Sequence, residues 1–217
     1  MIRALVAIVG ILGTGALVVY YSAPFWMFPL PPDNATAAQV VTFGARYHDV
    51  ILLDTWLQAI GALLSVVFAL ALVHLAGAED RFAGRLTLLV GGAVLILALV
   101  EGAFALGALQ AGANGHPEAA LTCLDVYRVF VHVFLIAPSL FLVMGIALLD
   151  TRLLPPAFSY LAVGLGIVFQ VLGVAGLFSS AALLAVIVVL KAQDFWTVAA
   201  AVALVVRSGD ARPATRI

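Results

Sequence analysis

Hydrophobic residues fall into long runs along this chain, and short polar segments separate the runs. Each run reaches about 20 residues, the length that an α-helix needs to cross the hydrocarbon core of a bilayer. The pattern predicts a single all-α domain over residues 1–217, an integral membrane bundle of six transmembrane helices. The expected spans are approximately 2–21, 50–75, 86–110, 124–149, 157–178 and 180–206, with a short polar tail at 207–217.

Composition supports a membrane protein. Hydrophobic residues make up 65% of the chain, charged residues 10%, and the mean hydropathy is +1.21. A soluble domain needs about 25% charged residues to wet its surface. The net charge of −1 offers no basic surface for nucleic acid, and the single cysteine, Cys123, excludes an intrachain disulfide. We expect the lipid bilayer as the main partner, without a cofactor or a metal.

The first hydrophobic run resembles a secretory signal peptide, since Arg3 precedes an apolar stretch. The run ends in Tyr20, Tyr21, Ser22, Ala23 and Pro24. Bulky tyrosines followed by a proline are a poor substrate for cleavage, which requires small residues. The sequence therefore predicts that this segment is retained as a membrane anchor.

The last run is interrupted at Lys191–Asp194, so it could form one span or two short arms. Basic residues decide between these alternatives, because cytoplasmic loops are enriched in Lys and Arg. Six spans with both termini in the cytoplasm leave only Arg46 and Arg128 outside and Lys191 embedded. The basic residues on the cytoplasmic side are then Arg3, Arg81, Arg85, Arg152, Arg207, Arg212 and Arg216.

Few ionisable residues lie inside the spans, and they concentrate in the half nearer the external side. A charge at bilayer depth costs about 2.5–3.5 kcal/mol even on lenient scales, so such residues usually have a role. Only His74 and residues at the membrane edge occupy the cytoplasmic half. The outer group comprises Asp54, Glu101, Asp125, Arg128, His132, Lys191 and Asp194.

Helical spacing places several polar residues on shared faces. Asp54 and Gln58 are four residues apart, and Asp125, Arg128 and His132 follow a three-then-four spacing. Such stripes face the bundle interior rather than lipid, which predicts an outward-opening pocket. Pro138 is expected to kink the fourth span and to free a carbonyl near the pocket floor. The residues expected to line the pocket are Gln58, Asp125, Arg128, Gln170, Lys191, Asp194, Trp56 and Tyr127.

Local pairing explains some of the charged residues. Asp125 with Arg128, and Lys191 with Asp194, have the three-residue spacing of intrahelical ion pairs. Asp54, Glu101 and His132 have no such partner, which makes them the candidate catalytic residues. Burial of an isolated carboxyl favours its neutral form, so Glu101 is expected to hold a proton and Asp54 to be ionised. His132 is either a hydrogen-bonding core residue or a proton carrier.

The segment between the first two spans, residues 22–49, is predicted to be an external loop. Four prolines between Pro24 and Pro32 exclude a helix, and the interspersed aromatic residues favour the headgroup layer. This piece is expected either to cap the outer face of the bundle or to serve only as an interfacial anchor.

The end of the chain, Ala192-Gln193-Asp194-Phe195-Trp196 followed by an apolar run and Arg207-Ser208-Gly209, resembles the last helix of a broad family of small bacterial integral membrane proteins of unknown function. The resemblance implies a multi-pass protein of a bacterial inner membrane. It carries no catalytic residues.

Four functional hypotheses remain open. The first is a membrane-embedded enzyme, a lyase or isomerase that performs acid–base chemistry on a lipophilic, isoprenoid-like substrate, for example protonation-triggered terpenoid cyclisation. The second is a proton-linked transporter. The third is a haem site with His48 and His132 as ligands, although these residues are expected at different depths. The fourth is a non-catalytic accessory or assembly subunit. The sequence does not determine the oligomeric state.

Overall fold

The structure, a computed structural model, describes residues 1–23, 27, 30–137 and 139–209. It is all-helical, with 84% helix and no strand in this part of the chain. Six helical stretches are long and apolar enough to cross a membrane, as the sequence predicts. The helices are α1 (Ile2–Tyr20), α3 (Ala37–Leu75), α4 (Phe82–Ala113), α5 (Pro117–Ile136), α6 (Leu140–Leu148), α7 (Pro156–Gly176) and α8 (Ser180–Gly209).

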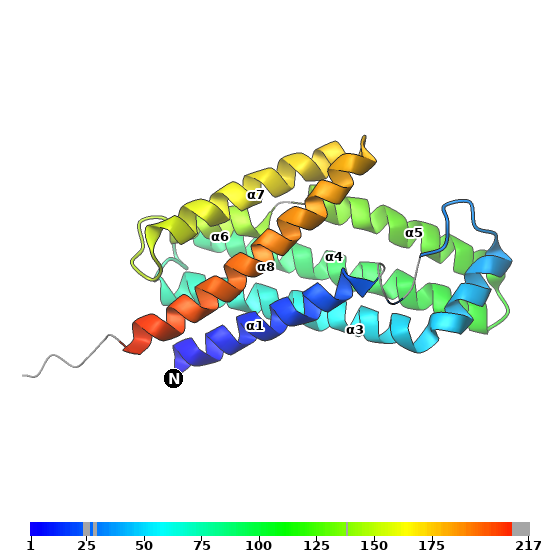
Figure 1. Cartoon of the computed structure of the whole chain (residues 1–217), viewed down its shortest axis with the longest axis horizontal. Coiled ribbons are helices and arrows are strands. Elements are labelled where there is room, and N and C mark those ends of the chain that lie inside the picture. Colours follow the sequence, from blue (N-terminus) through cyan, green and yellow to red (C-terminus); the bar gives the residue numbers. More distant parts are fainter. Residues whose placement is uncertain (24–26, 28–29, 138, 210–217) are drawn as a thin grey trace, which may run out of the picture.

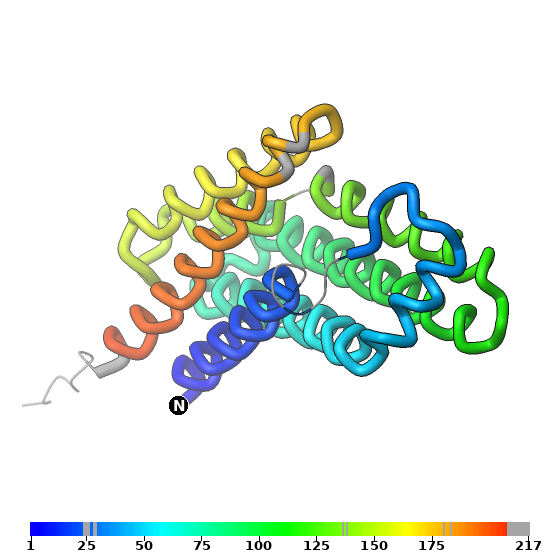
Figure 2. Tube along the Cα trace, turned by 45° about the vertical axis from the view of Figure 1, so that its right-hand side comes forward, coloured from blue at the N-terminus to red at the C-terminus, as the bar shows by residue number. Residues whose placement is uncertain are grey.

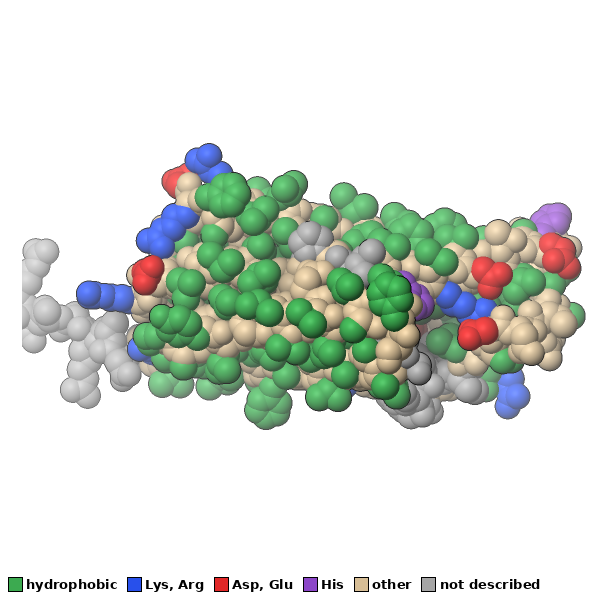
Figure 3. Space-filling view, turned by 90° about the horizontal axis from the view of Figure 1, so that it is seen from above, with side chains coloured by type: hydrophobic (Ala, Val, Ile, Leu, Met, Phe, Trp, Pro, Cys, Tyr) green, Lys and Arg blue, Asp and Glu red, His purple; other side chains and the backbone are tan. Residues whose placement is uncertain are grey.

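The six helical stretches alternate in direction, with α5 and α6 together forming the fourth, so that the N-terminus and the end of α8 lie at the same end of the bundle (Figure 1). We call this end the inner end and the opposite one the outer end. At the inner end, Arg207 donates hydrogen bonds of 3.3 Å to the carbonyls of Arg152 and Leu153. Seen from above, hydrophobic side chains dominate the surface between two charged ends (Figure 3). This distribution matches a bundle that spans a bilayer.

Helix α3 begins much earlier than predicted. Its first residues, expected in a loop up to residue 49, are helical from Ala37 onward. A capping box starts the helix: Thr36 accepts a hydrogen bond from the backbone of Gln39, whose side chain accepts one from the backbone of Thr36. The helix then kinks at Tyr47, where φ is −113° and ψ is 19°. The segment before the kink crosses the outer end of the bundle (Figure 1).

The fourth span is broken into α5 and α6 rather than kinked. Helix α5 ends at Ile136 and α6 begins at Leu140, on either side of Pro138, which lies outside the described residues. Gln170 of α7 serves the break, because its Oε1 accepts a hydrogen bond of 3.2 Å from the backbone nitrogen of Ser139. A helix break inside a membrane needs such partners for its backbone groups.

The main hydrophobic core lies in the inner half, where α1, α3, α6, α7 and α8 meet. Leu72, Met144 and Leu204 are at most 1% exposed there. Trp196 is buried as well and donates a hydrogen bond of 2.8 Å from its indole nitrogen to the carbonyl of Phe158. Gly166 packs so closely on α6 that a Cβ would overlap the backbone of Leu142. Such contacts are typical of membrane helices, which associate through small residues.

The outer half is built differently. Helices α3, α4 and α5 extend beyond the outer ends of α1, α7 and α8 (Figures 1 and 2). A smaller cluster of Ala35, Val40, Ala120 and Leu124 holds the extended part together. Helix α1 is only 19 residues long and packs against α3 and α8, and its last residue, Tyr20, reaches Glu101 near the middle of α4. The polar residues of the candidate site lie around the end of α1.

Candidate functional site

The end of α1 delivers a tyrosine hydroxyl to a buried carboxyl. Tyr20, the last residue of α1, donates a hydrogen bond of 2.8 Å from its hydroxyl to Oε1 of Glu101 on α4. The Glu101 residue is only 4% exposed. Gln58 of α3 also interacts with the carboxyl of Glu101 and is equally buried. Glu101 therefore joins three helices through polar side chains.

Asp54 is the second buried carboxyl of this cluster. It lies one helical turn before Gln58 on the same face of α3 and is 8% exposed. Its carboxyl is close enough to Glu101 for the two groups to interact electrostatically. Unlike Glu101, Asp54 has a buried oxygen, Oδ1, without any hydrogen-bond partner. An unpaired buried acceptor costs about 1–3 kcal/mol, so its presence requires an explanation.

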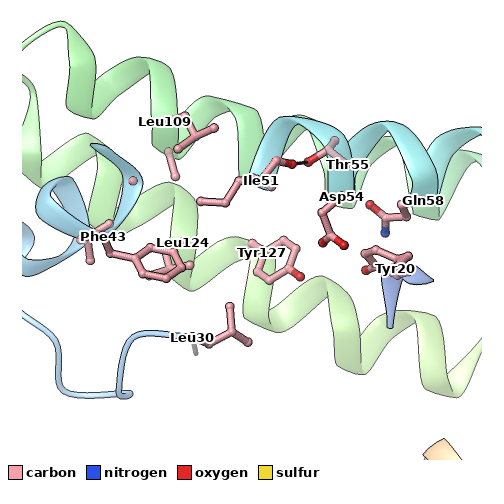
Figure 4. A pocket seen from close by; sticks show the side chains of 14 residues that line it. Tyr20, Leu30, Phe43, Ile51, Asp54, Thr55, Gln58, Leu109, Leu124 and Tyr127 are labelled. Carbon is pink, nitrogen blue, oxygen red and sulfur yellow. Dashed lines mark hydrogen bonds between the residues drawn. The ribbon is translucent and has the colours of Figure 1, made fainter. Parts of the chain in front are cut away.

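A cavity opens in front of Asp54, and its polar residues gather at one end. Asp54, Gln58, Tyr20 and Tyr127 lie around that end, which we call the cavity floor (Figure 4). Glu101 is not part of the lining, but it contacts two residues that are, Tyr20 and Gln58. The space open to the centres of water-sized molecules is about 50 Å³. A site of this size holds a few water molecules or a small group.

The other walls of the cavity are apolar. Phe43, Leu109 and Leu124 form the outer part in Figure 4, and Leu30 reaches it from the segment before α3. The remaining lining residues are Val40, Gly44, Ile51, Thr55, Ala105 and Ala108. The arrangement is an apolar passage that ends at a carboxyl group. This combination of an apolar body with few polar groups is typical of sites for small organic ligands.

Arg128 holds the segment that carries Leu30. Its Nη2 donates hydrogen bonds to the carbonyls of Pro31 and Pro32, at 2.8 and 3.0 Å. The expected ion pair with Asp125 is present, with 3.1 Å between Nη1 and Oδ1. Neither residue of this pair lines the cavity. Prolines 24 and 29 of the expected external cap lie outside the described residues.

His132 is separate from the two carboxyls. It is half-buried on α5, where its Nδ1 lies 3.0 Å from the carbonyl oxygen of Arg128, and it does not line the cavity. His48 lies 2.9 Å from Asp49, and its side chain is 53% exposed. The described residues contain no group of three His, Cys, Asp or Glu side chains that could hold a metal ion.

Lys191 and Asp194 do not form the expected ion pair. Lys191 instead donates a hydrogen bond of 2.8 Å to Oγ of Ser22, and its Nζ lies 4.2 Å from the centre of the Tyr21 ring. Oδ2 of Asp194 is buried without a hydrogen-bond partner. Neither Lys191 nor Asp194 lines the cavity. Both lie on α8, and Lys191 contacts the segment that follows α1.

Two further residues expected in the pocket lie elsewhere. Gln170 serves the break between α5 and α6, as described above. Trp56 points to the outside of α3 and is 60% exposed. It lines an open groove between α3 and α4, which Thr55 and Gly102 also border. Thr55 lines both the groove and the cavity.

Sequence reasoning missed Tyr20, which connects α1 to the site. It was interpreted only as a residue unsuited to cleavage, since the depth of its hydroxyl depends on where α1 ends relative to α4. The prediction that Trp56 lines the pocket overlooked its helical spacing, because a residue two positions from Asp54 lies on nearly the opposite face of the helix.

No protein-family model, curated protein or solved structure matches this chain. The function is therefore argued from the geometry of the site.

Proposed function

We propose that the cavity in the outer half of the bundle takes up a lipophilic molecule and exchanges a proton with it through Asp54. One observation carries this proposal. Asp54 lines the end of an apolar passage, and one of its two carboxyl oxygens, Oδ1, is buried without a partner. A ligand or substrate that reaches the floor would supply the missing contact.

Glu101 is proposed as the positioning residue of the pair. It accepts a hydrogen bond from Tyr20, interacts with Gln58 and lies outside the cavity lining. Two carboxyl groups in the same apolar surroundings are costly to ionise together, so the pair holds a proton that can be exchanged. Asp54 would contact the ligand directly. Glu101 would influence the charge of the Asp54 carboxyl from outside the cavity lining.

The enzymatic form of this proposal is acid–base chemistry on an isoprenoid-like substrate. Asp54 would donate its proton to a carbon–carbon double bond, and the resulting carbocation would cyclise. Loss of a proton from a neighbouring carbon to the Asp54 carboxylate would then restore the acid. The rings of Tyr20 and Tyr127 at the floor can stabilise positive charge. A long substrate must extend through the opening, since the cavity itself is small.

A comparison of membrane lipids tests the enzymatic form. Cells would produce the wild-type protein, Asp54→Asn or Asp49→Asn, and their extracted lipids would be analysed by mass spectrometry. Asp49 is the matched control, because it lies five residues earlier on α3 with a 98% exposed side chain. We expect a lipid product with wild type and Asp49→Asn that disappears with Asp54→Asn. Identical profiles for all three, at equal protein levels, would contradict catalysis.

A proton-linked transporter is the second candidate, and the break between α5 and α6 favours it. Discontinuous membrane helices are common at transport sites, where backbone groups freed by the break contact the substrate. Here Gln170 and the start of α6 provide such a break. Proteoliposomes with an imposed pH gradient would test this form, with substrate flux expected for wild type and lost in Asp54→Asn.

We further propose that both termini face the cytoplasm of a bacterial cell. The inner end carries Arg3, Arg81, Arg85, Arg152 and Arg207, as expected for a cytoplasmic surface. Labelling of a cysteine introduced at the N-terminus in intact and in lysed cells would test this orientation, with labelling expected only after lysis.

A further inference from the structure

We propose that the ligand is a lipophilic amine, bound with its protonated nitrogen at the cavity floor. This inference rests on the proposed function, in that a lipophilic molecule enters the cavity at Asp54. It narrows the substrate from any lipophilic molecule to one whose buried end carries both a positive charge and an N–H donor. For this class of ligand the proton of Asp54 passes to solvent rather than to the ligand.

The charges around the floor favour a cation. Asp54 lines the floor and Glu101 stands behind it, whereas no Lys, Arg or His side chain lines the cavity among the described residues. Two basic groups of the outer half have other partners: Arg128 contacts Asp125 and the carbonyls of Pro31 and Pro32, and Lys191 contacts Ser22. An anionic ligand would therefore meet uncompensated carboxyls in an apolar setting, which is strongly unfavourable.

The hydrogen-bonding groups favour a donor on the ligand. Oδ1 of Asp54 lacks a donor, although the Asp54 residue is 92% buried, the complement of its 8% exposed fraction. An ammonium N–H at the floor would satisfy this oxygen in a charge-assisted hydrogen bond. The aromatic rings of Tyr20 and Tyr127 border the same end of the cavity and can face a cation (Figure 4).

The shape of the cavity decides between an organic and an inorganic cation. The polar floor continues into a passage lined by Phe43, Leu109 and Leu124, which offers no oxygen ligands but suits a hydrocarbon tail. With about 50 Å³ available, a primary ammonium fits the floor more easily than a quaternary head does. The tail would lie in the apolar passage toward the outer end.

Binding would be linked to proton release. A protonated amine pairs with Asp54 only when that group is a carboxylate, so the proton that it holds before binding passes to solvent. The ammonium keeps its own protons, and the total charge of the site is unchanged. One proton is therefore released for each amine that binds.

The experiment uses the full-length protein in nanodiscs, with affinities and proton release measured by titration calorimetry in buffers of different ionisation enthalpy. Hexylammonium, hexanol and hexyltrimethylammonium share one tail but differ in charge and in the N–H donor. We expect hexylammonium to bind about 10-fold more tightly than either of the others. The order of the three affinities should be the same in sodium chloride and in choline chloride.

Three variants complete the test. Asp54→Asn should lower the affinity for hexylammonium about 10-fold without affecting hexanol, whereas the exposed control Asp49→Asn should change neither. Ala105→Phe fills the cavity and should abolish binding of both. The comparison of the three probes on wild type stands even if a variant fails to fold.

The outcomes separate this inference from the proposed function. Equal affinities for hexanol and hexylammonium, both lost in Ala105→Phe, would overturn the amine and keep the lipophilic cavity. Competition by sodium ions would also overturn it in favour of an inorganic cation. Absence of any binding that depends on Ala105 would overturn both proposals.

Discussion

The inner and outer halves of this bundle are built from similar helices but packed in opposite ways. In the inner half, five helices enclose a core in which Leu72, Met144 and Leu204 are almost completely buried. In the outer half, α1 ends early and leaves Asp54 and Glu101 buried beside a cavity. The inner half has the features of a scaffold, because its helices pack closely around this core.

The two halves differ in what their buried groups contribute to stability. Membrane helices gain stability from close packing of small residues, as at Gly166 against Leu142. An unpaired carboxyl oxygen such as that of Asp54 works against stability, and functional sites commonly retain such groups. Removal of the Asp54 carboxyl should therefore have the opposite effect on stability to a substitution that disturbs the close packing of the inner half.

The largest effect is expected in the inner half, from Gly166→Ala. The new Cβ would overlap the backbone of Leu142, which cannot move aside without separating α6 from α7. We expect the free energy of unfolding to fall by about 3 kcal/mol. Gly164→Ala is the matched control, since its Cβ meets nothing within 4 Å. Thermal unfolding in detergent would measure both, and equal melting temperatures would contradict the close packing of α6 on α7.

A smaller and opposite pair of effects is expected from the two carboxyls. Glu101→Leu removes the acceptor of the Tyr20 hydroxyl and leaves that buried donor unpaired, so stability should fall by about 2 kcal/mol. Asp54→Leu removes a buried acceptor that has no hydrogen-bond partner, so stability should rise by about 1 kcal/mol.

Chemical denaturation of the two variants beside wild type would show these opposite signs. A loss of stability in Asp54→Leu as large as that in Glu101→Leu would mean that Asp54 has a structural role.

The smallest expected effect is a difference in stability between substitutions of two neighbouring tyrosines, Tyr20 and Tyr21. Tyr20→Phe deletes a hydroxyl that donates to Glu101 and should cost about 1 kcal/mol. Tyr21→Phe deletes a buried hydroxyl without a hydrogen-bond partner, so it should be neutral or slightly stabilising. Melting temperatures of the two variants would measure the difference, and an equal loss would show that the Tyr20 hydroxyl contributes nothing specific.

Much of the fold could be predicted because hydrophobic runs report directly on helices that cross a membrane. The described residues form six helical stretches long and apolar enough to cross a membrane, as the sequence predicts, and the break near Pro138 falls where the missing backbone donor predicts a disturbance. The helical start of α3 at Ala37 was missed, since the prolines before it suggested a loop throughout and the capping box of Thr36 and Gln39 was overlooked.

The candidate site could be predicted only in part. The shared face of Asp54 and Gln58 follows from their spacing, and both line the cavity. The partners of single charged residues did not follow from spacing, because Lys191 contacts Ser22 on a distant segment rather than nearby Asp194. His132 and Trp56 lie at suitable depths yet outside the cavity, since depth along a helix says nothing about which neighbour it faces.

By itself, the sequence determined that this chain forms helices long and apolar enough to cross a membrane, with polar groups concentrated in one half, because hydropathy and the helical repeat are local properties. Only the tertiary structure decided that Glu101 is held by Tyr20, that Asp54 faces the cavity, and that the other charged residues lie apart from them. Those outcomes depend on where α1 ends and on how α3 and α4 are rotated against each other. Packing between distant segments sets both.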